Sequence, residues 1–234
     1  MLQNKKVKVL AIVPARKGSV GIPNKNLKKV GGISLIARVA SIIKMVPWIT
    51  EAIITTDSEK MRAEGIKNGL KAPFLRSAKL STSFANGPDV LMDAWLRAEK
   101  FFQIKFDFAL YMEPTSPLRT VKDINEAFKL LINSNYDSVV SVSETPAHYS
   151  PEKTLQINKN KLSFYHSNGS KIHSRQKIPH YYHRNGAVYA VRRAPFFKYK
   201  KIITNNTGAY LIERSMVNID DVFELELANW LISR

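Results

Sequence analysis

The residues best suited to chemistry follow a short apolar run near the amino terminus. In AIVPARKGSVGIPNKN, the segment from Arg16 to Asn26 places glycines, a proline and three cations directly after hydrophobic residues. Backbone N–H groups freed by glycine and the charges of Arg16, Lys17 and Lys25 are groups that bind phosphate. We interpret the segment as an anion-binding loop in which Gly18 and Gly21 let N–H groups form a nest. An ordinary glycine loop is the alternative.

The sequence lacks the motifs of several other common kinds of site. The loop matches neither GxxxxGK[ST] nor GxGxxG, so it is neither a Walker loop nor a dinucleotide fingerprint. The chain has no cysteine, which excludes thiolate chemistry and disulfides. All five histidines lie between residues 148 and 183. A metal site at His180 and His183 is conceivable, but the surrounding sequence lacks a regular ligand scaffold.

Apolar runs alternate with amphipathic stretches and must position this loop. Predicted strands cover residues 7–13, 51–57, 72–76, 106–112, 136–144, 185–191 and 208–214. Predicted helices cover residues 33–46, 58–69, 88–102, 120–134 and 221–233. The alternation predicts an α/β fold with a doubly wound, mostly parallel, Rossmann-like sheet. Ligands bind such sheets beyond the carboxyl ends of the strands, which is where the Arg16–Asn26 loop begins.

The alternation stops between Thr145 and Arg184, where the sequence is polar, aromatic and basic. A structureless loop of this length is uncommon inside a compact domain. We therefore predict one domain over residues 1–234 with a small extended arm at residues 145–184. A homodimer would give the arm a surface to pack against.

The chain is strongly basic, with 36 Lys and Arg against 19 Asp and Glu in 234 residues. This excess favours anionic partners such as nucleic acid, a membrane surface or acidic small molecules, although a solvated basic surface is the simpler interpretation. The amino-terminal apolar run is short and lacks a small-residue cleavage site, and no stretch has the length of a membrane span. We expect a cytoplasmic protein without membrane contact.

A set of motifs makes the chain resemble one enzyme family. VPARKGSVGIPNKN resembles the amino-terminal signature of the acylneuraminate cytidylyltransferases, the CMP-sialic acid synthetases. The similarity continues in the same order through TTDSE, FLRSAKLS, YMEPTSPLRT, SRQKIP, RNGAVYAV and NIDDVFELELA. It implies a nucleotidyltransferase fold with a dimerisation arm. It also implies transfer of CMP from CTP to the anomeric hydroxyl of a nine-carbon 2-keto acid sugar, with Mg²⁺ and release of pyrophosphate.

The resemblance assigns residues to the nucleotide. Arg16 and Lys25 match residues that contact the triphosphate, while Ala15 and Asn26 match positions beside the nucleotide. Arg76 matches an arginine that recognises cytosine. In SFANGPD, which matches a loop on the CTP side, Asn86 is our candidate.

Other residues are assigned to the sugar. Lys153 and Arg175 match positions that reach across a dimer toward the sugar carboxylate, which Arg grips through paired hydrogen bonds. Asn185 and Tyr189 match residues of the sugar pocket, and we expect them to share one face of a strand. Glu113 stands where sialic acid synthetases usually have Gln, and it faces either the sugar or the metal.

For the metal, we predict Asp220 as the main protein ligand and Glu113 as a second carboxylate. Asp221 is expected to cap the closing helix instead. Asn218 replaces the first Asp of the family's D-x-D motif, and Val20 replaces a usual Lys.

These departures leave the sugar open among N-acetylneuraminic, pseudaminic and legionaminic acids, with Kdo as an alternative. A basic nucleic-acid-binding or scaffold protein on the same fold is the alternative from another class, although nucleic acid is the less expected partner.

Overall fold

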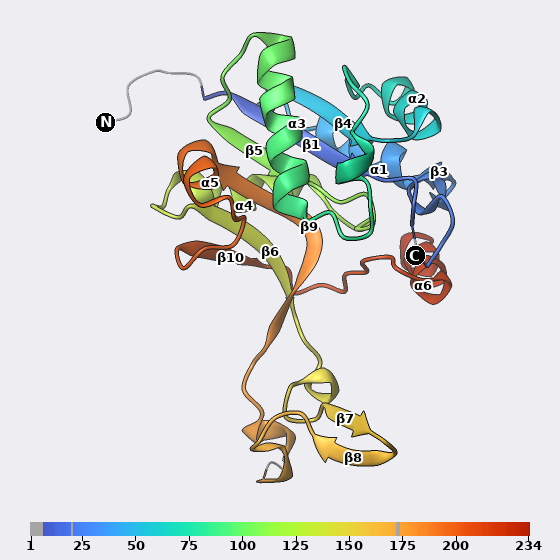
Figure 1. Cartoon of the computed structure of the whole chain (residues 1–234), viewed down its shortest axis with the longest axis vertical. Coiled ribbons are helices and arrows are strands. Elements are labelled where there is room, and N and C mark those ends of the chain that lie inside the picture. Colours follow the sequence, from blue (N-terminus) through green and yellow to red (C-terminus); the bar gives the residue numbers. More distant parts are fainter. Residues whose placement is uncertain (1–6, 20, 172–173) are drawn as a thin grey trace.

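A single six-stranded sheet organises the protein (Figure 1). The computed structural model describes residues 7–19, 21–171 and 174–234. The order across the sheet is β10-β6-β9-β5-β1-β4. In chain order, the strands are β1 (Val9–Ala15), β4 (Glu51–Thr56), β5 (Phe108–Tyr111), β6 (Ser138–Glu144), β9 (Tyr182–Arg192) and β10 (Thr207–Leu211).

Five of these strands run in one direction and β9 runs against them. β1 pairs in parallel with β4 and β5, and β10 pairs in parallel with β6, whereas β9 is antiparallel to both of its neighbours. The predicted mostly parallel sheet is therefore confirmed. The carboxyl ends of β1 and β5 lie side by side, which creates the edge where a ligand site is expected.

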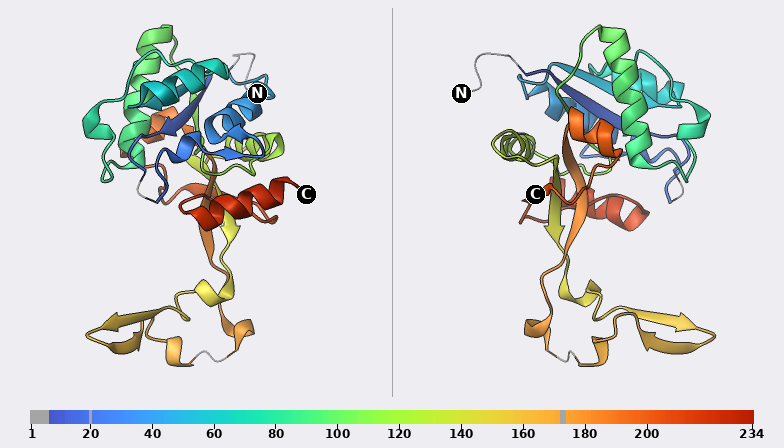
Figure 2. Two further views of the ribbon diagram at one scale, coloured as in Figure 1. Left: turned by 90° about the vertical axis from the view of Figure 1, so that its right-hand side faces the viewer. Right: turned by 60° about the vertical axis from the view of Figure 1, so that its left-hand side comes forward.

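Helices cover both faces of the sheet, and alternation along β1 shows why. Val9, Ala11 and Val13 pack with α1 and α4 in one apolar cluster, whereas Leu10 and Ile12 pack with α3 and α5 in another. Figure 2 shows α3 on one side of the sheet and α1 and α4 on the other. The helices are α1 (Leu35–Lys44), α2 (Glu59–Lys67), α3 (Gly87–Phe102), α4 (Val121–Ile132), α5 (Arg193–Tyr199) and α6 (Val222–Ile232). None of the described helices is long and apolar enough to cross a membrane.

Polar side chains set where the helices begin. Ser34, Ser58 and Asn86 each accept a hydrogen bond from a backbone N–H in the first turn of α1, α2 and α3. Thr120 and Asp221 form full capping boxes at α4 and α6. The predicted capping role of Asp221 is thus confirmed.

The sequence analysis was wrong about two elements. Residues 72–76 form no strand, and the preceding residue, Lys71, makes one isolated bridge with Ile53 of β4. The basic segment after β9 forms α5, which the sequence analysis missed. Phe196 of α5 is buried and stacks on Trp95 with ring centroids 5.8 Å apart. Packing against the sheet, rather than local periodicity, stabilises this short helix.

The predicted excursion is an arm that projects from the body between β6 and β9 (Figures 1 and 2). The two strands continue as its neck, where Glu144 pairs with Tyr182. Beyond the neck, the hairpin of β7 (Leu155–Asn158) and β8 (Lys161–Phe164) is exposed along both strands. An isolated two-stranded hairpin is at best marginally stable in water, and within the described part of the chain this hairpin lacks a covering surface.

After β10 the chain crosses back over the sheet edge to the amino-terminal loop. Ile219 N–H donates to the carbonyl of Thr115 at 2.8 Å. Val217, Ile219 and Ala228 join Ile22 and Val30 in a third, separate apolar cluster. Val30 belongs to a small hairpin, β2 (Lys29–Val30) with β3 (Ile33–Ser34). This crossing places Asp220 beside the Arg16–Asn26 loop.

A β-bulge interrupts the pairing of β6 and β9. The register shifts between Val140 and Val142, and Gly186 has a φ of +70°. A Cβ at Gly186 would overlap with the Glu113 carboxylate and lie 2.7 Å from Ser116 Oγ. Both the left-handed backbone and the close approach of Glu113 therefore require glycine here.

We predict that Gly186→Ala destabilises the protein more than Gly32→Ala does. Gly32 has a φ of +84° with no atom within 4 Å of an added Cβ, so it isolates the backbone cost of about 1 kcal/mol. Gly186→Ala adds the steric overlap, for a total loss of about 3 kcal/mol. Urea denaturation measures both free energies of unfolding. Equal losses would contradict the assigned packing of Glu113 on Gly186.

Candidate active site

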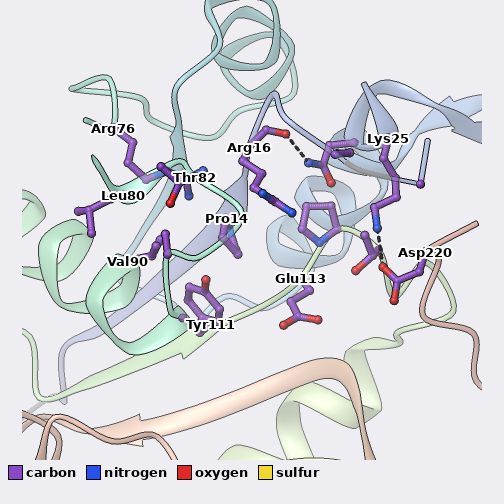
Figure 3. Close-up of a pocket in the computed structure, with 17 residues that line it drawn as sticks. Pro14, Arg16, Lys25, Arg76, Leu80, Thr82, Val90, Tyr111, Glu113 and Asp220 are labelled. Atoms are coloured by element: carbon purple, nitrogen blue, oxygen red, sulfur yellow. Dashed lines mark hydrogen bonds and ion pairs between the residues drawn. The ribbon is translucent and has the colours of Figure 1, made fainter. Parts of the chain in front are cut away.

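A cavity of about 570 Å³ opens at the carboxyl ends of β1 and β5 (Figure 3). Figure 3 shows Arg76, Leu80 and Val90 along one side, Lys25 with Asp220 at the other, and Arg16 between. The first side offers apolar walls and one buried guanidinium, while the second is rich in charge. This size and division suit a ligand with an uncharged ring at one end and phosphates at the other.

Lys25 and Asp220 form the ion pair of the charged half. Nζ of Lys25 donates to Oδ1 of Asp220 at 2.6 Å, across 195 positions of sequence. The Lys25 side chain is 13% exposed and that of Asp220 is 79% exposed, so Asp220 keeps most of its surface available to a ligand. Because one carboxylate faces two cations, Arg16 and Lys25, this half favours an anion.

The loop approaches Asp220 closely because residue 21 is glycine. A Cβ at Gly21 would overlap with the carbonyl oxygen of Asp220. Neither Gly18 nor Gly21 has a left-handed φ. Since Val20 between them lies outside the described residues, the nest stays a prediction, whereas Gly21 serves close approach.

The remaining nucleotide candidates of the loop lie at its base. Asn26 is buried, lines the cavity, and donates from Nδ2 to the Arg16 carbonyl at 3.4 Å. The Ala15 side chain belongs to the core beside α1. Only the backbone of Ala15 is therefore available to a ligand. Val20 lies outside the described residues.

Arg76 lies in the half of the cavity that has the apolar walls. It is buried, its Nε donates to Ser81 Oγ at 3.1 Å, and its Nη2 lies 3.9 Å from Asp57. Burial lowers the pKa of Arg76, and the nearby charge of Asp57 opposes this effect. A guanidinium fixed in this way presents donors in a set direction, as recognition of a ring's polar edge requires.

Asn86 has a structural task that the sequence analysis did not assign to it. Its Oδ1 accepts from Asp89 N–H at 2.8 Å, and its Nδ2 donates to Asp89 Oδ2 at 2.8 Å. Its neighbours Ala85 and Gly87 line the cavity. Nucleotide contact by Asn86 stays a prediction.

Glu113 lies at the cavity where β5 ends. The Tyr189 hydroxyl donates to Oε1 at 3.4 Å, and burial raises the pKa of Glu113 against the opposing effects of Arg119, Arg184, Tyr189 and Asn218. Arg184, exposed on β9, was missed by the sequence analysis. Its position in RNGAVYAV, directly before Asn185, offered no signal that it would approach Glu113.

Glu113 and Asn218 are neighbours. A Cβ on Gly186 would meet the Glu113 carboxylate and also lie 3.3 Å from Asn218 Nδ2. The Asn218 amide oxygen is buried and has no hydrogen-bond partner in the described part of the chain. Two positions at which this sequence departs from the acylneuraminate pattern are thus in contact.

Asn185 and Tyr189 do not share a face, which corrects the sequence analysis. The Asn185 amide binds Ser141 Oγ at 2.7 Å and Ser143 Oγ at 3.0 Å on one face of β6. Tyr189 packs with Val140 on the other face. Between the pairs Val140–Tyr189 and Val142–Arg184, β9 carries three extra residues around Gly186, and this odd number reverses the alternation. Asn185 is 2% exposed with its amide engaged, so among these two only Tyr189 approaches Glu113.

The two predicted carboxylate-binding cations lie on the arm. Lys153 lines a hollow with Ala147 and Ile178, and it is not among the residues that line the cavity at the ends of β1 and β5. Arg175 belongs to a short 3-10 helix, and its side chain lies outside the described residues. The chain does not bring Lys153 to its own cavity.

Asp220 and Glu113, the predicted metal ligands, line the same cavity. Neither they nor the histidines belong to a described group of three or more His, Cys, Asp or Glu that could hold a metal. A metal here would therefore depend on ligand oxygens as well as on the protein.

The fold is shared with a solved enzyme structure. CMP:2-keto-3-deoxy-manno-octonic acid synthetase, complexed with CTP, superposes with a TM-score of 0.72 over 97% of this chain and 98% of that chain, at 16% identity. At that identity the similarity shows the nucleotidyltransferase fold alone. The sequence model of the cytidylyltransferase family matches residues 10–214, so the chain belongs to the cytidylyltransferase family.

Curated relatives extend over the whole chain. Post-translational flagellin modification protein B of Campylobacter coli is 27% identical over 96% of this chain and 94% of its own length. CMP-N,N'-diacetyllegionaminic acid synthase of Campylobacter jejuni is 26% identical over 96% and 95%. N-acylneuraminate cytidylyltransferase of Escherichia coli is 31% identical over 95% of this chain, which spans 52% of that protein.

Proposed function

We propose that the protein transfers CMP from CTP to the anomeric hydroxyl of a nine-carbon 2-keto acid sugar of the N-acetylneuraminic, pseudaminic or legionaminic type. One observation carries the proposal: a single cavity joins the Arg16–Lys25 cations to the buried guanidinium of Arg76. Membership of the cytidylyltransferase family and the relatives that act on such sugars support it.

In this reaction the sugar hydroxyl attacks the α-phosphorus of CTP, a new P–O bond forms, and the bond to the β-phosphate oxygen breaks to release pyrophosphate. Both nucleophile and leaving group come from substrates, so the protein holds them in line and neutralises charge. Arg16 and Lys25 bind the triphosphate, and Arg76 orients the base. Glu113 lines the cavity, the Tyr189 hydroxyl donates to it, and we assign the sugar to this side.

The donor set fits Mg²⁺, a hard cation that binds through one or two carboxylates together with substrate phosphates. Asp220, with its exposed carboxylate, and the unpartnered amide oxygen of Asn218 are oxygen donors, and Glu113 supplies the second carboxylate. When bound, the ion neutralises charge on the triphosphate.

We further propose that Glu113 and Asn218 exchange the roles of an amide and an acid. In the acylneuraminate pattern an amide stands at position 113 and an acid at position 218, whereas this chain has the reverse. Since the two side chains are in contact, the exchange keeps one negative charge at nearly the same place.

We also propose that the arm serves a homodimer in the cytoplasm. Leu155, Ile157 and Leu162 on the hairpin, and Phe223 and Trp230 on α6, are large apolar side chains left exposed by the single chain. A second copy would cover such surfaces and bring Lys153 and Arg175 to its partner's cavity.

Pyrophosphate release tests the function. The wild-type protein should release pyrophosphate with CTP and one of the named sugars, and little with ATP, GTP or UTP. Arg16→Ala and Lys25→Ala should each lower the rate about 100-fold or more, since each removes a preorganised charge from a reacting phosphate. Lys129→Ala, an exposed charge on α4, is the control. Activity with Kdo alone would assign another sugar, and oligonucleotide binding without CTP turnover would favour the nucleic-acid alternative.

The exchange of acid and amide is tested by a double variant. Glu113→Gln removes the second carboxylate, and Asn218→Asp places two carboxylates in contact. Each single variant should therefore raise the Mg²⁺ concentration needed for half-maximal rate. The double variant Glu113→Gln/Asn218→Asp should recover most of the wild-type Mg²⁺ dependence. Additive losses in the double variant would show that the two positions act independently.

Complementation tests the arm. Arg175→Ala and Lys25→Ala subunits should each be inactive alone. The first lacks the arm cation that reaches the partner's cavity, and the second lacks a cation of its own cavity. After subunit exchange, each hybrid dimer contains one site with both cations, and part of the activity should return. Exchange verified by native mass spectrometry without recovered activity would show that the arm serves its own subunit.

A further inference from the structure

Phe84 is the most exposed of the large hydrophobic side chains in the described chain, at 95%. A phenyl ring left in water forgoes the stabilisation that burial would give it. Single exposed apolar residues are common on protein surfaces. The position of Phe84 and the anchoring of its loop distinguish it from these.

Phe84 belongs to the rim of the cavity. Thr82 and Ala85, on either side of it in sequence, both line the cavity, as do Leu80 and Gly87 farther out. This rim borders the half that holds Arg76 and the apolar walls, and it is separate from Lys25 and Asp220 (Figure 3).

The rim segment is fixed at both ends and lightly held between them. Ser81 Oγ accepts from Arg76 and donates to the Ser77 carbonyl at 2.9 Å, while Asn86 caps α3. Between these anchors, one backbone hydrogen bond joins Ala85 N–H to the Thr82 carbonyl at 3.3 Å. A Cβ added at Gly87 would have no atom within 4 Å. The packing therefore leaves room for the backbone of the segment to rotate there.

The cavity wall opposite this rim is suited to bind a flat ring. Val90 and Tyr111 line it, and burial, together with the charge of Glu113, raises the pKa of Tyr111 and keeps its hydroxyl neutral. A pyrimidine placed against this wall would have one face covered by protein and the other exposed at the rim. Aromatic side chains stack on such exposed base faces.

We propose that Phe84 is a binding residue that closes over the exposed face of the pyrimidine when CTP enters the cavity. The inference rests on the proposed function, because it takes CTP as the ligand. It assigns to the rim a contact with the base and none with the phosphates.

Equilibrium binding of CTP and of inorganic tripolyphosphate tests this division. Phe84→Ala should weaken CTP binding about tenfold, equivalent to about 1.4 kcal/mol, and leave tripolyphosphate binding unchanged. Phe84→Tyr should bind CTP like the wild type. Phe101→Ala, which removes another exposed phenyl from the far end of α3, is the matched control. Phe84→Trp adds a reporter whose emission should change with CTP but not with tripolyphosphate.

The outcomes separate this inference from the proposed function. A wild-type protein that binds no CTP would overturn both. If the wild type binds CTP and Phe84→Ala binds it equally well, the inference about Phe84 alone is wrong. Equal weakening of CTP and tripolyphosphate binding would also overturn it, because the effect would then lie in the phosphate half.

Discussion

The buried guanidinium of Arg119 ties the bulge of β9 to the end of β5 beside the cavity. It is 4% exposed and donates to the carbonyls of Ala187, Gly186 and Glu113, the last at 2.6 Å. Burial lowers its pKa to about 10, so it stays charged under ordinary conditions. The carbonyls of Gly186 and Glu113 also accept from the N–H groups of Glu113 and Ser116, each at 3.3 Å, so Arg119 adds a charged donor to both. The position of Glu113, and the approach of Gly186 to it, follow from this clamp.

The sequence predicted those parts of the molecule that depend on local pattern. Periodicity located the body helices other than α5 and all but one of the body strands that it proposed, and the cap at Asp221 followed from its place before an apolar stretch. The motif PTSPLR pointed to the site, yet its arginine proved to be a structural clamp. The residue pattern alone contained no signal for this, because the carbonyls that Arg119 binds belong mostly to a strand more than sixty positions away.

The errors share one physical origin, which is that extra residues in a strand or a tertiary contact override local pattern. The bulge at Gly186 reversed the alternation on which the pairing of Asn185 with Tyr189 relied. Residues 72–76 have strand-like composition, but Arg76 is drawn toward Asp57 and Ser81 and the segment leaves the sheet. Contacts of this kind arise from residues distant in sequence, as does the meeting of Glu113 with Asn218.

The third apolar cluster has a consequence for how the protein loses its site. Asp220 lies on a segment that is packed by a small cluster apart from the two main layers of the core. Cooperative units with few buried contacts open at lower free energy than the whole domain. Amides of α6 should therefore exchange with solvent earlier than those of β1, and warming should remove the carboxylate from the cavity while the sheet is still intact.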